Sequence, residues 1–457
     1  MISEIKKGLI KIVINSKFQY FLLNIYIIKQ LCFNVEGIKM RGLIFSNIMM
    51  SILLTTAAFN ISSNKIIGEN PIDIGLRKET LKEINSSNIL YVGGNGPNNY
   101  SKIQDAIDDA SNGDIVFVYN GTYIENILIE IQIKIQGENK STTIIQGKDD
   151  WHTVNIKSSR VNLTDFTISN GGDPYAGVNS KGDYNSFYNV IITDNNFYGI
   201  QLLDSLHCIL NKCEVSNNYN TGIIVSHSKY TTIINTDILF NNRGLDLYYS
   251  SNNNISDNFF ENNYNALGLF WGKQNGESTS YNIIKGNIIT NNMMGISSAG
   301  HKDGEVSYNI ITENYIAFNK GKPGAGIVLG AYTSENKVHH NILIDNIDIE
   351  LNWINNGWDH GENNHWYEGE AGNYWSDYKE RYPKAIPKIL KPWIWNKPYE
   401  IDGWGSSIDR YPFINENLKS KNICQYKNQR YPISLSQIEK NHDHIRLIKL
   451  IIKNTHK

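Results

Sequence analysis

Four polar residues recur at a regular spacing in the middle of the chain and are the best candidates for contacting a ligand. They are Asp204, His227, Tyr249 and Lys273, and each stands five residues after a glycine that opens a short apolar run. If each run is one strand of a stack, the four side chains share one face and combine hydrogen-bonding groups with a flat aromatic ring, as sugar binding requires. We therefore predict a ligand-binding stripe in which Tyr249 contributes most by stacking. The alternative is a solvated strand edge of mixed polar residues.

Two carboxylates are weaker candidates, for catalysis. Asp237 ends an Asn-Thr-Asp sequence, and Asp257 follows about one repeat later, a separation that suits a carboxylate pair acting on a glycosidic bond. Enzymes of the polygalacturonase type add a histidine and a basic residue at fixed repeat offsets, whereas His301 and Lys302 come about one repeat too late here. We therefore favour a protein without catalysis, with a polysaccharide lyase or glycoside hydrolase as the alternative.

One segment gathers residue types that bind metals. Asp359, His360, Glu362 and His365 lie close together in the sequence. Their spacing matches none of the common metal-binding motifs, so we interpret the segment as a loop of capping polar residues. We predict neither a metal site nor a cofactor.

An internal repeat must position all these candidates. A glycine followed by a short apolar strand returns at Gly177, Gly199, Gly222, Gly244, Gly268, Gly295 and Gly326, at intervals of 22, 23, 22, 24, 27 and 31 residues. An asparagine pair precedes most of these glycines, at 195–196, 217–218, 241–242, 262–263 and 291–292. Because the two rows keep the same phase, they indicate a structural repeat rather than a compositional bias.

The repeat predicts a stack of short strands. Each unit is too short and too rich in β-branched residues for helix, so we expect two strands, a bend and a loop per repeat, stacked about 4.8 Å apart on their neighbours. The asparagines should form hydrogen-bonded ladders at one bend, and the glycines should relieve crowding at the other. The predicted fold is all-β: a right-handed single-stranded parallel β-helix with about 22–24 residues per rung and roughly nine or ten rungs.

The chain also resembles a known family. The residues that carry the resemblance are Ile89 to Pro97, Tyr100 to Ala110, Asn112 to Val118, Asn120 to Asn126, Gln136 to Gly147, Gly372-Asn-Tyr-Trp-Ser-Asp-Tyr378 and Asp409-Arg-Tyr-Pro412. These segments are similar to NosD-like β-helix proteins, which are repetitive secreted or surface proteins related to carbohydrate-binding and sugar-hydrolase β-helices. The resemblance implies the same fold over about 85–415. It also implies, as a further alternative, a periplasmic accessory protein for a copper enzyme.

Both ends of the stack should be capped. At the N-terminal end, Ser101 is expected to cap a short helix whose apolar face is Ile103, Ala106, Ile107 and Ala110. At the C-terminal end, the tryptophans between 353 and 404 are expected to seal the last rung, or alternatively to offer a sugar-stacking platform. The predicted parts are a cap with the first rungs at 85–150, the repeats at 151–357, an aromatic cap at 358–415 and a basic tail at 416–457.

The N-terminal region carries a targeting signal. Met40 and Arg41 precede an apolar run that ends in small residues near Ala58, which is the layout of a secretory signal. We predict a mis-called extension at 1–39, a signal peptide at 40–61 and a linker at 62–84. A membrane anchor at the N-terminus is the alternative.

Charge and composition restrict the partners. Lysine plus arginine total 43 against 45 aspartates and glutamates, so no global basic field attracts nucleic acid. We predict a secreted or cell-surface scaffold that binds carbohydrate or another cell-envelope component.

Overall fold

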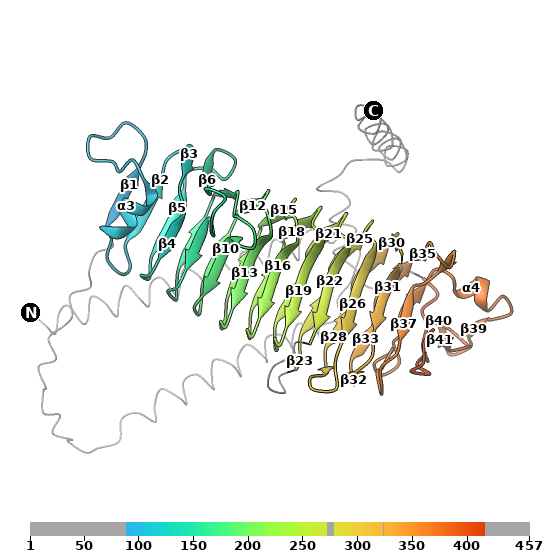
Figure 1. The fold of residues 1–457 in the computed structure, drawn as a ribbon. Helices are drawn as coiled ribbons and strands as arrows, with labels where there is room; N and C mark the ends of the chain where they lie inside the picture. Colours follow the sequence, from blue (N-terminus) through green and yellow to red (C-terminus); the bar gives the residue numbers. More distant parts are fainter. Residues whose placement is uncertain (1–87, 272–277, 323, 416–457) are drawn as a thin grey trace, which may run out of the picture. The chain divides into compact units, whose positions relative to one another are not determined.

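The computed structural model describes residues 88–271, 278–322 and 324–415. Short parallel strands stacked along one axis are the main feature of this region (Figure 1). The segments predicted at 1–39, 40–61, 62–84 and 416–457 lie outside the described residues.

Three parallel sheets, here named A, B and C, form the walls of the stack. Sheet A contains β1 (Ile89–Val92), β2 (Ile115–Val118), β5 (Lys134–Gly137), β8 (Asn162–Thr164), β11 (Ser186–Tyr188), β14 (Ile209–Asn211), β17 (Thr232–Ile234), β20 (Asn254–Ser256), β24 (Ile283–Lys285), β28 (Ile310–Thr312) and β33 (Lys337–His339). Sheet B contains β3 (Gly121–Ile124), β6 (Thr143–Gln146), β9 (Thr167–Ser169), β12 (Ile191–Thr193), β15 (Glu214–Ser216), β18 (Asp237–Leu239), β21 (Phe259–Glu261), β25 (Ile288–Thr290), β29 (Tyr315–Ala317), β34 (Ile342–Ile344) and β38 (Tyr374–Trp375). Sheet C contains β4 (Ile127–Ile129), β7 (Val154–Ile156), β10 (Ala176–Lys181), β13 (Tyr198–Leu203), β16 (Thr221–Ser226), β19 (Arg243–Tyr248), β22 (Asn265–Phe270), β26 (Met294–Ala299), β31 (Ala325–Leu329) and β37 (Gly357–Asp359).

Each turn of the chain adds one strand to each sheet, in the order A, B, C. The sheets hold 11, 11 and 10 strands, so the stack has about eleven turns, slightly more than the predicted nine or ten. The structure also has three strands per turn where the sequence predicted two. The additional strand belongs to sheet A, whose strands are mostly three residues long and lie in the segment predicted to be a loop. The predicted class, an all-β parallel β-helix, is confirmed.

Along the sheet C strands, every second side chain is directed inward, and these side chains build the core. Ile200 and Leu202 of β13, and Ile223 and Val225 of β16, are fully buried. The register pairs Ile200 with Ile223, so identical faces stack directly above one another. This arrangement buries every inward side chain between two like neighbours, which a single turn cannot do.

The register corrects the predicted repeat at β22. Asp246 pairs with Gly268, so the residue equivalent to Gly244 is Ala266 rather than Gly268. The inward pair on this strand is therefore Leu267 and Leu269, which are 0% and 1% exposed. Trp271 is half-buried just after the strand, although counting from Gly268 as the repeat glycine would direct it into the core. The count failed because an alanine replaces the repeat glycine on this rung.

Asparagine ladders run along all three corners of the helix. The predicted ladder lies between sheets B and C, where each side-chain Nδ2 donates to the next Oδ1 at 2.8–3.2 Å. Its members are Asn195, Asn218, Asn241, Asn263, Asn292, Asn319, Asn346 and Asn356. A second ladder joins Asn258, Asn287, Asn314, Asn341 and Asn373 between sheets A and B, and a third joins Asn253, Asn282, Asn309, Asn336 and Asn364 between sheets C and A. The buried side-chain amides of these ladders thereby find hydrogen-bond partners.

The bends themselves depend on residues other than the ladder asparagines. Asn217, Asn262 and Asn291 have φ of 55°, 58° and 56°, and each directly precedes a ladder residue. The repeat glycines lie within strands instead of at a bend, and they serve close packing. A Cβ at Gly222 would lie 2.8 Å from the backbone oxygen of Gly244. The prediction that the glycines relieve a bend is therefore wrong, because the constraint is space beside the next strand.

The N-terminal cap is the helix α3 (Ile103–Asp108), whose residues Ile103, Ala106 and Ile107 are buried. Ser101 does not cap it. Glu125 accepts hydrogen bonds from the backbone N–H groups of Ile103 and Gln104 at 2.8 and 3.0 Å. The cap residue thus comes from beyond β3, where no local signal could indicate it.

The C-terminal cap combines a short helix, α4 (Tyr378–Arg381), with the strands β39 (Pro387–Lys388), β40 (Lys391–Trp395), β41 (Tyr399–Glu400) and β42 (Ile408–Asp409). Trp366 and Trp375 are 0% and 1% exposed, and Trp375 stacks on Tyr399 with ring centroids 4.0 Å apart. These residues seal the last rung as predicted. Trp404, by contrast, is 87% exposed.

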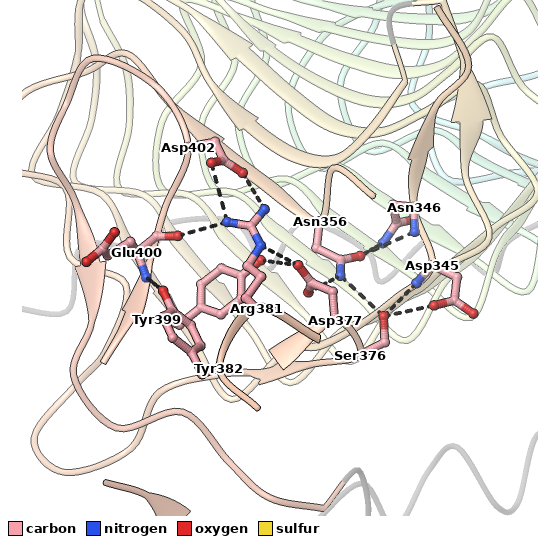
Figure 2. Close-up of polar contacts among 10 residues, drawn as sticks. All are labelled: Asp345, Asn346, Asn356, Ser376, Asp377, Arg381, Tyr382, Tyr399, Glu400 and Asp402. Carbon is pink, nitrogen blue, oxygen red and sulfur yellow. Dashed lines mark hydrogen bonds and ion pairs between the residues drawn. The ribbon is translucent and has the colours of Figure 1, made fainter. Parts of the chain in front are cut away.

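Each ladder ends at a buried carboxylate of this cap. Asn356 donates to Asp377 at 2.9 Å, and Asn364 donates to Asp359 at 3.0 Å. The backbone N–H of Asn373 donates to Asp409 at 2.7 Å. Figure 2 shows the first of these ends, where Asp377 also pairs with Arg381, whose guanidinium reaches Asp402.

Candidate functional site

The register places Asp204, His227 and Tyr249 in one row on the corner between sheets C and A. The residues before them, Leu203, Ser226 and Tyr248, are successive Cα partners. Tyr248 in turn pairs with Phe270, so the fourth residue of the row is Trp271. Lys273, the fourth predicted residue, lies outside the described residues and two positions beyond the row.

Rings in this row stack on their neighbours. The His227 and Tyr249 rings lie 4.5 Å apart at 24°, and those of Trp271 and His301 lie 3.9 Å apart at 12°. Tyr249 is only 8% exposed. Its ring is thus largely covered by the protein, which conflicts with its expected role as an open stacking face.

A second row on the same corner presents far more aromatic surface. We call it the tyrosine row, and it consists of Tyr184, His207, Tyr230, Asn252, Tyr281 and Tyr308, all with φ between 56° and 59°. Backbone hydrogen bonds align the row. For example, the N–H of Tyr184 donates to the oxygen of Leu206, directly before His207, and that of Tyr230 donates to Ser251, directly before Asn252. The four tyrosines are 48–55% exposed.

The rings of the tyrosine row lie parallel, one per rung. Tyr184 and Tyr230 each stack on His207 at 4.9 Å, with interplanar angles of 10° and 12°. Tyr281 stacks on Tyr308 at 5.2 Å and 5°. The sequence held a signal for this row, since His207, Tyr230 and Asn252 each follow a residue of the predicted stripe by three positions. Sequence reasoning missed it because it compared glycines rather than aromatic residues.

The outer face of sheet C carries a buried ion pair beside this corner. Asp246 is 0% exposed although it points outward, and Arg243 donates to it from Nε at 2.5 Å and from an Nη at 3.0 Å. The Arg243 guanidinium lies 4.5 Å from the centroid of the Phe270 ring, and the Tyr248 hydroxyl donates to Asp246 at 3.3 Å. Burial raises the pKa of Asp246, and the neighbouring Arg243 opposes that rise.

The two catalytic candidates do not occupy matching positions. Asp237 opens β18 and pairs with Phe259 of the next rung. Asp257 lies on the corner between sheets A and B, directly after Ser256, whose partner Ile234 precedes Asn235. Asp257 is thus the counterpart of Asn235, and the alignment of repeats offers no support for a catalytic pair.

The fold defines the class of this protein as a right-handed parallel β-helix. Residues 152–304 match the family model described as "Right handed beta helix region". Residues 275–380 match the model described as "Periplasmic copper-binding protein (NosD)". Together these matches confirm the predicted resemblance to NosD-like β-helix proteins.

A curated relative of this chain is named as a surface protein. The chain is 28% identical over 341 residues to the cell surface glycoprotein of Methanothermus fervidus, covering 66% of this chain and 55% of the relative. The predicted cell-surface location is borne out by this relationship. The chain spans just over half the length of that relative.

Solved structures with a similar arrangement share little sequence with this chain. The mannuronan C-5 epimerase AlgE4 A-module of Azotobacter vinelandii has a TM-score of 0.44 and 13% identity, covering 59% of this chain and 84% of its own. The polygalacturonase of Erwinia carotovora subspecies carotovora has a TM-score of 0.45 and 10% identity, covering 65% and 97%.

The described residues do not fit a copper site. Among them, no group of three or more histidine, cysteine, aspartate or glutamate side chains is placed to hold a metal ion. His360 accepts a hydrogen bond from the Trp358 indole at 2.5 Å, and His365 lies 3.5 Å from Glu335. Copper sites in proteins are built from several convergent nitrogen or sulfur ligands. Likewise, within the described ranges no helix is long and apolar enough to cross a membrane.

Proposed function

We propose that this protein is a cell-surface scaffold that binds carbohydrate along the corner between sheets C and A, without catalysis. The tyrosine row is the observation that carries this proposal. Its four tyrosines leave about half of their surface in water at 48–55% exposure. Aromatic rings with polar hydroxyl tips suit sugars, which present apolar C–H faces and hydroxyl rims.

The core of the β-helix does not require these rings. Inward residues such as Ile200, Ile223 and Leu245 are fully buried, and buried asparagines satisfy the bends. Ring stacking within the row contributes only about 0.5–1.5 kcal/mol per pair. The row therefore adds exposed apolar surface beyond what the fold needs, as a recognition surface does.

Polar groups beside the rings supply hydrogen bonds. Asp204 and Lys229 are exposed on the same corner, and Ser226 contacts the His227 imidazole at 3.0 Å. Cell-surface proteins lie next to envelope polysaccharides, and the relative of this chain is itself named as a cell surface glycoprotein. A glycan of the cell envelope is the ligand class that these features support.

A glycan array probed with the full-length protein tests this proposal. We expect binding by the native protein and its loss in a variant that combines Tyr184→Ala, Tyr230→Ala and Tyr281→Ala. The matched control combines Tyr219→Ala with Tyr264→Ala, two exposed tyrosines off this corner. Full binding by the triple variant, or no binding by the native protein, would refute the proposal.

Cleavage of the bound glycan is a second candidate function. The Arg243–Asp246 pair favours it, because a buried carboxylate of raised pKa on an outer face is typical of reactive sites. Product analysis on any array glycan that the protein binds decides whether cleavage occurs. Intact glycan after prolonged incubation excludes cleavage, whereas products that vanish with Asp246→Asn would establish it.

A further inference from the structure

The stack of rings in the tyrosine row is interrupted once. Tyr184, His207 and Tyr230 occupy three successive rungs, and Tyr281 and Tyr308 occupy two later ones. Between these groups the row position belongs to Asn252, whose backbone N–H donates to Ser280, directly before Tyr281. Because the residues of the row share one backbone conformation, with φ between 56° and 59°, we take one face of Tyr230 and one face of Tyr281 to be directed toward each other across Asn252.

The width of this slot follows from the rung spacing. Neighbouring rings in the row lie 4.9–5.2 Å apart. Two rungs therefore separate the Tyr230 and Tyr281 rings by about 9.8–10.4 Å. A planar ring touching both faces would need only about 7–8 Å, because carbon atoms make contact at about 3.5–4.0 Å. The slot is too wide for an aromatic ring and suits a thicker, puckered one.

A pyranose chair has this thickness, because axial C–H bonds project from both faces of the ring. Only a sugar whose hydroxyl groups are all equatorial, as in glucose or N-acetylglucosamine, presents C–H groups on both faces at once. An axial hydroxyl, as in mannose or galactose, would be desolvated against one tyrosine ring. The Asn252 amide, which donates to Ser251 Oγ at 3.3 Å, and the two tyrosine hydroxyls are polar groups that can pair with equatorial hydroxyls.

We infer that Tyr230, Asn252 and Tyr281 form a subsite that holds one gluco-configured pyranose ring between two tyrosine faces. This inference rests on the proposed function and deepens it by naming the sugar. It requires the glycan to cross the corner at this rung. The stacks on either side, with Tyr184 and His207 before and Tyr308 after, fix the two walls.

Filling the slot tests the inference directly. Asn252→Tyr would place a ring in the gap, and the left-handed backbone there accepts tyrosine, as Tyr184, Tyr230 and Tyr281 show at φ of 58–59°. Binding of cellotriose and chitotriose is measured by calorimetry. We expect the native protein to prefer these probes to mannotriose, and Asn252→Tyr to weaken their binding about tenfold or more.

The matched control is Glu335→Tyr. Glu335 occupies the same row one rung after Tyr308, with φ of 55°, so the substitution lengthens the stack and leaves the slot open. It should bind like the native protein. Tyr230→Ala and Tyr281→Ala, each removing one wall, should weaken binding even if the filled variant is unstable.

The outcomes separate the subsite from the proposed function. If Asn252→Tyr binds like the native protein while the triple tyrosine variant does not, the subsite is wrong and the binding corner stands. An equal preference for mannotriose would also overturn the subsite. If the native protein binds none of the array glycans, both fail together.

Discussion

At the scale of single residues, the C–A corner combines covered and open rings. Tyr249 lies against His227 and is 8% exposed, whereas Tyr230, three residues beyond His227, is 49% exposed. Both follow a strand of the same sheet, and both sit at left-handed backbone positions. The difference in exposure divides their roles, since a covered ring stabilises the fold and an open ring can meet a ligand.

Tyr249→Ala should therefore destabilise the protein, whereas substitution of an exposed surface residue should have little effect. The loss should be about 2–4 kcal/mol, because a nearly buried aromatic side chain is removed. Tyr249→Phe keeps the ring and serves as the control, and Tyr281→Ala should change stability by less than about 1 kcal/mol. Urea unfolding measures all three, and equal stability of Tyr249→Ala and the native protein would contradict the assignment.

At the scale of elements, the asparagine ladders form a hydrogen-bonded network along the corners that join the three sheets. Every bond between ladder residues runs in the same direction, since one N–H of each side-chain amide donates toward the C-terminal end of the stack. Aligned amide dipoles place partial positive charge at that end, where Asp359, Asp377 and Asp409 stand. The carboxylates thus complement the ladders as acidic residues complement a helix N-terminus.

Removing one ladder residue should show how much the stability of the fold depends on the ladder. Asn287 donates to Asn314 at 3.0 Å and to the Ile255 carbonyl at 2.8 Å, and it accepts from Asn258. Asn287→Ala strands these buried partners, so we expect a loss of about 3–5 kcal/mol. Asn242→Ala, at an exposed position next to a ladder residue, should cost less than about 0.5 kcal/mol. Comparable urea midpoints for the two variants would show that the ladder is dispensable.

The repeat glycines give a second test at this scale. A Cβ at Gly222 would approach the Gly244 oxygen at 2.8 Å and the Asn241 side chain at 2.9 Å, so Gly222→Val should destabilise by about 2–3 kcal/mol. Gly222→Ala should cost less, since Ala266 is accepted at the equivalent position. Thr232→Val, at a half-exposed strand position, is the control for a β-branched residue. Thermal unfolding of the three variants checks this order.

At the scale of the whole molecule, two caps close a stack whose sheets would otherwise end in open edges. The helix α3 covers the first turn (Figure 1). The rings of Trp366 and Trp375, which are 0% and 1% exposed, cover the last. Open strand edges can pair with other chains, and both caps cover such edges. The C-terminal cap depends on Asp409, which is fully buried and accepts hydrogen bonds from the Trp375 indole and from the Asn373 and Tyr411 N–H groups.

The burial of Asp409 makes the cap sensitive to pH. Burial raises the pKa of Asp409 to about 7. The folded state therefore keeps the Asp409 proton, which the unfolded chain releases near pH 4. The contribution of Asp409 to stability is full below about pH 4 and is lost as the pH rises to about 7. Differential scanning calorimetry should show this loss in the native protein. Asp409→Asn should flatten it, whatever its effect on absolute stability, and an unchanged slope would contradict the role of this carboxyl group.

The sequence by itself determined the solenoid, its asparagine ladder and its aromatic plug, because these follow from a period, and every rung repeats the same local chemistry. Only the tertiary structure decided the register of the strands. Ala266 occupies the position of a repeat glycine, so the fourth residue of the stripe is Trp271 and not Lys273. The tertiary structure also decided which side chains cap the helix α3 and which ones end the asparagine ladders. Glu125 caps α3 from beyond β3, and Asp359, Asp377 and Asp409 end the ladders from within the cap. Such pairings carry no period, since they join segments that meet only after the chain has wound around its axis.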